Sequence, residues 1–251
     1  MKDILIEEES VYIIGDVHGD YQKLERSLSI INVFRDEHGI WYNPHDYKII
    51  FLGDLNDSRI PLRKGYSVSS VTCLLWAKEL VDQHEAIVLN SNHHNNLYRA
   101  YIGKKSRLNN DLYRTLLEIS EYIEKGYDYL IEDIINWLKG LPCYHSFIHN
   151  AQRYTCVHAF YTPNMSKFNP KRKDFDRAIN GLIEKGELAK WWMNSRKYVR
   201  QGEIVIAGHY QVVGEYERAI MLDGGCGNVK GNTLVSLSIH NQNLDYFYTS
   251  E

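Results

Sequence analysis

The sequence has no hydrophobic run long enough for a membrane-spanning helix. Such a helix needs ~18 apolar residues in succession, and no segment of the chain approaches that length. The first ten residues carry four acids, which is unlike a signal peptide. An excess of one charge is also lacking, because 29 lysines and arginines nearly balance 32 acids and leave a net charge of −3. We therefore do not expect bulk charge to hold the protein on nucleic acid or anionic lipid.

Cysteine is scarce as well. The four cysteines form no C-x-x-C pair, so we expect free thiols and a cytoplasmic location. Because long apolar runs are also lacking, we expect no membrane partner. With 251 residues, 44% of them hydrophobic and 12% aromatic, the chain can bury a sizeable core. No linker rich in proline, glycine or serine divides it. We predict a single domain over residues 1–251.

Short β-rich runs alternate with helical patterns in the first half of the chain. Residues 21–33, 69–84 and most of 97–140 repeat apolar side chains at three-to-four spacing, which predicts helices. Predicted strands lie at 11–14, 48–52, 86–89, 153–157, 203–207, 219–222, 233–239 and 245–248, and the pattern turns to β from Tyr144 onward. This order predicts an α/β (α+β) fold with two sheets face to face and helices outside. We expect a helical insertion around residues 97–140 and a cap-like segment around 164–200.

Polar residues of the metal-ligand type directly follow five predicted strands. The segments are Gly15-Asp-Val-His-Gly19, Gly53-Asp-Leu-Asn-Asp57, Ser91-Asn-His-His94, Val157-His158 and Ala207-Gly-His209. Each motif alone is weak, but ligands gather at the carboxyl ends of strands in open α/β sheets, so the five segments are expected to converge. The ligand types present are two carboxylates, three imidazoles and an amide: Asp16, Asp54, His18, His158, His209 and Asn92.

This donor set suits two divalent metal ions. Six ligand-type groups are enough for a pair of ions, and an unshared carboxylate such as Asp54 can bridge ions ~3.5–4 Å apart. Oxygen and imidazole donors without thiolate favour manganese, iron or zinc over a structural cysteine-zinc site.

The ordered motifs resemble those of the calcineurin-like metallophosphoesterases, in their phosphoprotein-phosphatase branch. That family's motifs run G-D-x-H-G, G-D-x-x-D-R-G, G-N-H-E, H-A/G and G-H, and the resemblance extends from Val11 to about Thr249. Segments 92–99 and 222–227 are similar to those of bacterial diadenosine-tetraphosphatase-like proteins and of the phosphatase module of bacterial polynucleotide kinase-phosphatase. The resemblance implies a four-layer αββα sandwich of two central sheets flanked by helices.

The resemblance also implies roles for the metal ligands. The first ion would be bound by Asp16, His18 and Asp54, and the second by Asp54, Asn92, His158 and His209. Mn²⁺ is the expected metal, with iron or zinc as alternatives.

A proton donor is implied beside the ligands. His93 would be the general acid that protonates the leaving oxygen, and Asp57 would orient and support it. Chemistry suggests the same division, because a metal-bound hydroxide attacks phosphorus in line and the opposite oxygen needs a proton from a group that the metals do not use.

The chain departs from the family where substrate is bound. Ser58 stands where the family's G-D-x-x-D-R-G motif has its phosphate-clamping arginine. The remaining candidates for substrate contact are Arg59, Arg99, Arg196 and Tyr210. Because the six ligand types are all present, the departures bear on substrate specificity and not on metal binding.

We therefore predict a two-metal phosphoesterase that hydrolyses phosphate esters or anhydrides by direct attack of water. The predicted substrate is a phosphorylated small molecule, a nucleotide or a nucleic-acid end. One alternative is a Ser/Thr/Tyr protein phosphatase, which acts on a phosphoprotein. The other is a catalytically weak, metal-dependent protein that binds a nucleotide or a partner, because one fold supports many functions.

Overall fold

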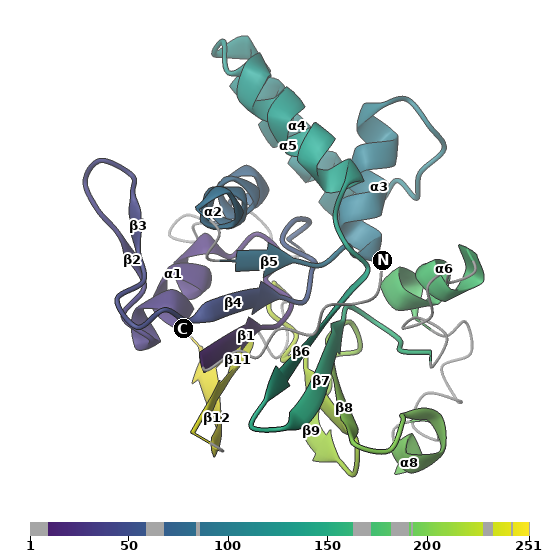
Figure 1. The fold of residues 1–251 in the computed structure, drawn as a ribbon. Coiled ribbons are helices and arrows are strands. Elements are labelled where there is room, and N and C mark those ends of the chain that lie inside the picture. The colour runs from purple at the N-terminus through teal and green to yellow at the C-terminus, as the bar shows by residue number, and fades with distance from the viewer. Residues whose placement is uncertain are drawn as a thin grey trace.

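The computed structural model describes residues 10–58, 68–83, 86–162, 172–181, 191, 193–227, 233–241 and 243–250. Two five-stranded sheets form its centre, and helices cover their outer faces (Figure 1). Among the described residues, no helix has the length and hydrophobicity needed to cross a bilayer.

The first sheet has the strand order β12-β11-β1-β4-β5. Its strands are β1 (Ser10–Ile14), β4 (Lys48–Phe51), β5 (Ala86–Val88), β11 (Leu234–His240) and β12 (Asn243–Thr249). Strands β1, β4 and β5 are parallel, whereas β11 pairs antiparallel with both β1 and β12. The carboxyl ends of the three parallel strands therefore share one edge.

The second sheet has the strand order β6-β7-β8-β10-β9. Its strands are β6 (Tyr144–His149), β7 (Gln152–Val157), β8 (Glu203–Ala207), β9 (Val213–Tyr216) and β10 (Ala219–Leu222). Strands β7, β8 and β10 are parallel, and the antiparallel strands β6 and β9 flank them. This sheet also presents a set of carboxyl ends at one edge.

Helices lie outside both sheets and beside them. Near the first sheet are α1 (Tyr21–Ile30) and α2 (Ser70–Asp82), together with a hairpin of β2 (Phe34–Arg35) and β3 (Trp41–Tyr42). The run α3 (Asn92–Tyr101), α4 (Asn110–Glu124) and α5 (Asp128–Lys139) projects from the body of the molecule in Figure 1. The second sheet is covered by α6 (Arg172–Asn180) and α8 (Ser195–Tyr198).

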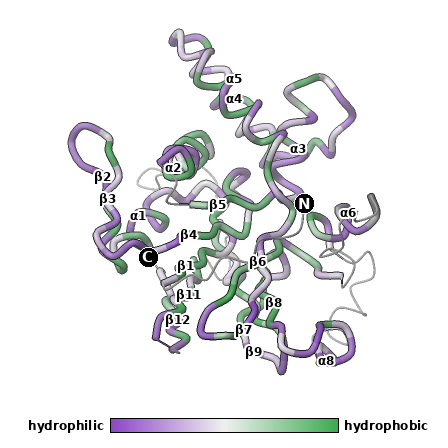
Figure 2. Tube along the Cα trace, viewed as in Figure 1, coloured by the Kyte–Doolittle hydropathy of each residue, from purple (hydrophilic) through white to green (hydrophobic). Residues whose placement is uncertain are grey.

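Alternation along the strands divides the core into three clusters. On β1, Tyr12 and Ile14 pack with the helices, whereas Val11 and Ile13 pack between the sheets. A third cluster joins strand residues such as Met221 to the helices of the second sheet. Hydrophobic residues accordingly concentrate on the central strands and α2, and hydrophilic residues on α6, α8 and the β2–β3 hairpin (Figure 2). Three apolar interfaces between four layers confirm the predicted αββα sandwich.

The predicted elements are present, with three differences. The helix predicted over 21–33 ends at Ile30, because Asn32 takes a left-handed φ of 58°. The helical stretch begins at Asn92, five residues before the predicted start, because the Ser91 hydroxyl accepts the His94 N–H and caps α3. The β2–β3 hairpin and β9 were not predicted. Much of the cap-like segment, 163–171, 182–190 and 192, lies outside the described residues.

Candidate metal centre

The five polar segments predicted from the sequence leave the two sheets at carboxyl ends. Asp16 follows β1, Asp54 follows β4, and Asn92 opens α3 shortly after β5. His158 directly follows β7, and His209 lies two residues beyond β8. Parallel pairing within each sheet places these segments side by side, as expected for a ligand site on an α/β sheet.

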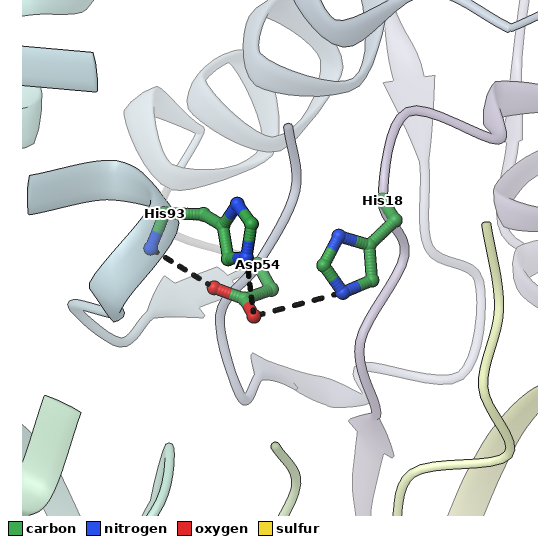
Figure 3. A group of neighbouring side chains, drawn as sticks. All are labelled: His18, Asp54 and His93. Atoms are coloured by element: carbon green, nitrogen blue, oxygen red, sulfur yellow. Dashed lines mark hydrogen bonds and ion pairs between the residues drawn. The ribbon is translucent and has the colours of Figure 1, made fainter. Parts of the chain in front are cut away.

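Asp54 lies between two groups of donor atoms. Its Oδ2 atom is 3.6 Å from His18 Nε2 and 4.0 Å from His93 Nε2, the group drawn in Figure 3. The same Oδ2 atom is 3.4 Å from His158 Nε2, and Asp54, His158 and His209 form the second group of donors. Within each group the donor atoms lie within 4.8 Å of one another. A carboxylate shared in this way would be available to a metal ion in either group.

Asn92 completes the second group. Its Oδ1 atom lies 2.9 Å from His158 Nε2, and His209 Nδ1 lies 3.2 Å from the same nitrogen. An amide oxygen, a carboxylate oxygen and an imidazole nitrogen thus surround one ring nitrogen. These are donor types that Mn²⁺, iron and zinc accept.

Backbone carbonyls select the ring nitrogens that face the centre. His158 Nδ1 lies 3.0 Å from the carbonyl oxygen of Leu52. His18 Nδ1 lies 3.2 Å from the carbonyl oxygens of Asn56 and Asp57. The Nδ1 atoms are therefore the N–H donors, and each Nε2 keeps the lone pair that a metal ion requires.

Asp16 supplies a test of whether a cation fits here. Its Oδ2 atom accepts the backbone N–H of His209 at 3.0 Å, whereas its Oδ1 atom is buried without a hydrogen-bond partner. The chain keeps space for this carboxylate, because a Cβ on Gly208 would lie 2.2 Å from Oδ1. A buried carboxylate oxygen without a partner costs stability unless a cation compensates it, so the donor set fits a metal ion.

Four residues of the site have left-handed backbone conformations. The φ angles are 50° at His18, 46° at Asp54, 70° at Asp57 and 73° at His209. Residues other than glycine take such angles rarely, at a cost of ~1–3 kcal/mol each, and they concentrate at functional sites. The strained backbone at this edge therefore indicates a functional site, and this indication does not depend on the types of the side chains.

Electrostatics favour the protonation states that bind a cation. Burial alone would raise the pKa of Asp54, but the imidazoles of His158, His93 and His18 hold it well below its ordinary value. Burial lowers the pKa of His209 to about 3, with the charge of His158 adding to the effect. Asp54 is thus ionised and His209 neutral.

Asp16 shows the opposite shift. Burial, followed by the charges of Asp223 and Asp54, raises its pKa well above the ordinary value for an aspartate. A bound divalent cation would offset both the burial of this carboxylate and its repulsion by the neighbouring carboxylates.

His93 and Asp57 form a buried pair beside the cluster. His93 Nδ1 lies 2.7 Å from Asp57 Oδ2, and the backbone N–H of His93 donates to Asp54 Oδ1 at 3.3 Å. The first turn of α3 therefore places the imidazole with Nδ1 toward Asp57 and Nε2 toward Asp54. A carboxylate that holds one ring nitrogen in this way fixes the tautomer and raises the basicity of the other.

The partners of Asp57 were not predicted from the sequence. Its Oδ1 atom accepts from Asn56 Nδ2 at 2.8 Å and from Thr115 Oγ1 at 2.7 Å, and its backbone N–H donates to Ser70 Oγ. Thr115 is 1% exposed, on the inner face of α4. The only available signal was a hydroxyl on the apolar stripe of a helix, which many structural threonines share.

The residues predicted to bind substrate are dispersed. Arg99 donates from Nε and Nη2 to the carbonyl oxygen of Lys105, which closes the loop after α3. Arg196 is exposed on α8 and pairs with Glu217. Among the described residues, no hydrogen bond or ion pair joins either arginine to the six ligand-type side chains.

Tyr210 does lie at the cluster. Its ring packs edge-on against His209, with centroids 4.8 Å apart. Arg59 lies outside the described residues. At Ser58 the structure instead brings in Arg114 of α4, whose Nη1 donates to the Ser58 carbonyl oxygen at 3.3 Å.

Comparison with known proteins identifies the class that this fold and site define. The calcineurin-like phosphoesterase family matches residues 10–248, which is nearly the whole chain. The chain therefore belongs to the calcineurin-like phosphoesterases, a family with a dinuclear metal centre.

Particular relatives are bacterial. The chain is 30% identical over 135 residues to a bis(5'-nucleosyl)-tetraphosphatase (asymmetrical) of Halalkalibacterium halodurans, a match that covers 54% of this chain and 51% of the relative. It is 26% identical over 235 residues to the protein of that name from Anoxybacillus flavithermus, covering 90% and 88%. The first of these matches thus spans about half the relative's length.

The fold also matches a solved structure. A proposed diadenosine tetraphosphatase superposes with a TM-score of 0.59 at 17% identity, and the superposition covers 98% of both chains. At this identity the likeness concerns the fold.

Proposed function

We propose that this protein is a metal-dependent hydrolase of phosphate ester or anhydride bonds, and that its substrate is a nucleotide-type phosphate. The observation that supports this most strongly is the position of Asp54 between two groups of metal-ligand donors, next to the buried His93–Asp57 pair. Metal binding and proton donation are thereby available at one place.

The residues that would hold the two ions come from the two groups, except that Asp16 stands in place of His93, which we assign to proton donation. Asp16, His18 and Asp54 would bind one ion, and Asp54, Asn92, His158 and His209 the other. When bound, two such ions polarise a phosphoryl oxygen and lower the pKa of water. Mn²⁺ is our proposed metal, because the donors are imidazole, carboxylate and amide without thiolate.

His93 would supply the proton that the leaving oxygen needs. Asp57 accepts the Nδ1–H, so the proton for transfer is carried on Nε2, the nitrogen on the side of Asp54. Asp57 would also stabilise the imidazolium, because a buried carboxylate 2.7 Å from the ring favours the charged form. The 2.7 Å contact of the pair supports a role for His93 as general acid.

Support for a nucleotide substrate comes from the relatives. Two of them are named for cleavage of a bis(5'-nucleosyl) tetraphosphate, and we extend to this chain the broader class, a phosphorylated nucleotide. Nucleic-acid ends and phosphoproteins share the phosphate chemistry and enter the experiment as competing substrates.

The test is a substrate panel with metal control. The purified chain is assayed with Mn²⁺ and with excess chelator on diadenosine tetraphosphate, p-nitrophenyl phosphate, a 5'-phosphorylated oligonucleotide and a phosphopeptide. We expect Mn²⁺-dependent turnover with the highest kcat/KM on the dinucleotide. Asp54→Asn should abolish it, whereas Asp245→Asn, at an exposed position of β12, should behave as wild type.

Other outcomes discriminate among functions. Highest kcat/KM on the phosphopeptide would identify a protein phosphatase. If a metal-replete preparation turns over none of the four substrates, the hydrolase assignment is wrong and the chain is a metal-dependent binding protein.

A further inference from the structure

A pocket of about 330 Å³ lies along α4, beside the hydrogen-bond partners of Asp57. One wall is a face of α4 that carries Arg114, Thr115, Leu117, Glu118, Glu121 and Tyr122. The opposite wall is Ser58 together with Val68 and Ser70, at the start of α2. No residue of the α4 wall belongs to the predicted metal site.

One end of the pocket is formed by hydrogen-bond partners of Asp57. Thr115 Oγ1 donates to Asp57 Oδ1 at 2.7 Å and lies 3.0 Å from Ser70 Oγ, which accepts the Asp57 N–H. Each wall of this end therefore contributes one hydrogen-bond partner of Asp57. Ser58 directly follows Asp57 in the chain. A ligand that occupies this end is therefore beside the proposed site of hydrolysis.

The charge of the lining changes along the pocket. Arg114 stands at the Ser58 end, where its Nη1 donates to the Ser58 carbonyl oxygen. Glu118, Glu121 and Tyr122 follow on the same face, one to two turns further along α4. Because a helix rises ~1.5 Å per residue, Arg114 and Tyr122 are ~12 Å apart along the axis. A phosphate is stabilised at the first end and repelled by carboxylates at the second.

The second end suits a neutral group with hydroxyls or amines. Glu118 lies between the two ends, because it accepts the backbone N–H groups of Ser70 and Val71, which fixes its carboxylate against α2; Glu121 lies further along. Carboxylate oxygens accept from ribose hydroxyls and from amino groups of bases. Tyr122 provides an aromatic ring on which a base can stack, and Leu117 provides an apolar edge.

We propose that this pocket is a nucleoside subsite: it binds the ribose and base of the substrate, with Arg114 on the neighbouring phosphate. The inference rests on the proposed function and gives it a substrate class, a nucleoside whose phosphates extend toward His93. The pocket volume is at the lower end of the ~300–1,000 Å³ of small-molecule sites, which fits one nucleoside and is too small for an extended peptide.

The experiment compares two substrates in the Mn²⁺-loaded protein. Diadenosine tetraphosphate has nucleosides, whereas p-nitrophenyl phosphate has none. Arg114→Gln removes the cation, and Leu117→Trp narrows the pocket at a side chain that is 48% exposed and so tolerates replacement. Leu117→Trp should lower the ratio of kcat/KM for the dinucleotide to kcat/KM for p-nitrophenyl phosphate by ~10-fold, the size of one lost contact. Arg114→Gln should lower this ratio by less, because a guanidinium also attracts the phosphate of p-nitrophenyl phosphate.

Matched controls lie on the same part of the chain. Arg107→Gln removes a cation from the exposed segment before α4, and Tyr113→Trp enlarges a side chain that is 60% exposed on α4 outside the pocket. Both controls should leave the ratio within twofold of wild type, an interval of about 0.4 kcal/mol.

Product inhibition isolates the nucleoside. Adenosine monophosphate and inorganic phosphate are compared as inhibitors of p-nitrophenyl phosphate hydrolysis. Leu117→Trp should raise the inhibition constant of the nucleotide by ~10-fold, the size of one lost contact, and should raise that of inorganic phosphate far less.

The outcomes separate this inference from the proposed function. A wild-type protein inert on both substrates defeats the proposed function. An active wild-type protein whose substrate ratio and nucleotide inhibition are unmoved by Arg114→Gln and Leu117→Trp defeats the subsite alone. If Leu117→Trp impairs a phosphopeptide substrate and spares the dinucleotide, the pocket holds a peptide side chain and the nucleoside assignment is wrong.

Discussion

The two walls of the site are built in different ways. The metal-ligand wall consists of turns that follow parallel strands, where His18, Asp54 and His209 adopt left-handed backbone angles. The other wall is one face of the regular helix α4, whose Thr115 and Arg114 reach Asp57 and the Ser58 carbonyl. Strained turns hold short side chains such as that of Asp54 in fixed positions close to the sheet edge. A helix face presents longer side chains around a space of about 330 Å³.

The difference suggests a division of labour. Residues of the turns lie a few positions from the sheet edge and carry the proposed metal ligands, so we expect them to decide whether hydrolysis occurs. Residues of α4 contact Asp57 and Ser58, so we expect them to affect how firmly His93 is held and which substrate is preferred. Substitutions on the two walls should therefore differ in the size and in the kind of effect.

The largest effect is expected at Asp54. Asp54→Asn removes the carboxylate charge that both donor groups share, so metal content and turnover should fall together. The loss of activity should exceed the ~10²–10⁴-fold typical of a lost general acid. Elemental analysis should give about two ions per wild-type chain, as a two-metal site requires. Full occupancy in the variant would contradict the bridging role.

The next effect is expected at His93. His93→Asn should keep both metals and lower turnover by ~10²–10⁴-fold, the size of a lost proton donor. The loss should shrink on p-nitrophenyl phosphate, because p-nitrophenolate leaves without protonation. Since His93 Nε2 is also 4.0 Å from Asp54 Oδ2, metal content is the control that separates the acid from a ligand. An equal loss on good and poor leaving groups would rule out the acid.

Most of the first wall could be predicted from the sequence. Gly53 shows why. Its φ is 121°, and a Cβ there would lie 2.7 Å from the Ser91 Cβ, so this turn requires glycine and can be recognised in the sequence. A metal ligand after such a turn is then placed by the strand order. The helix start at Asn92 was missed, because Ser91 caps α3 within a run that looks like a loop.

The second wall could not be predicted in this way. Thr115 and Arg114 acquire their contacts from the packing of α4 against the turn after β4, between residues 56 to 58 positions apart in sequence. Nothing in the helix itself distinguishes them from a buried threonine and a surface arginine. The arginines predicted from the family resemblance, Arg99 and Arg196, point instead to a loop carbonyl and a surface glutamate.

A smaller effect is expected at Thr115. Thr115→Val keeps the side-chain shape but removes the hydroxyl that donates to Asp57 Oδ1, so His93 is held less firmly. We expect kcat to fall ~3–10-fold, part of the ~1.5–3 kcal/mol of a hydrogen bond to a charged group, with little change in KM. Thr115→Ser should restore kcat. If Thr115→Ser is as impaired as Thr115→Val, the hydroxyl has no positioning role.

The smallest effect is expected at Ser58, where the family motif has arginine. A phosphomonoester carries about −1.5 to −2 charges and a diester about −1, and an arginine stabilises the more charged group better. Ser58→Arg should therefore raise the ratio of kcat/KM for p-nitrophenyl phosphate to that for bis-p-nitrophenyl phosphate.

The rise should be only ~2–3-fold, because Arg114 already places a guanidinium at the Ser58 carbonyl and a second cation gains less in a partly exposed pocket. Ser58→Met, similar in length but uncharged, controls for filling the space. In the Arg114→Gln background the same substitution should have a larger effect, since the new arginine is then the nearer cation. An equal rise in both backgrounds would show that Arg114 does not contribute to phosphate binding. The turn that carries Ser58 and the face of α4 would then act on the substrate independently.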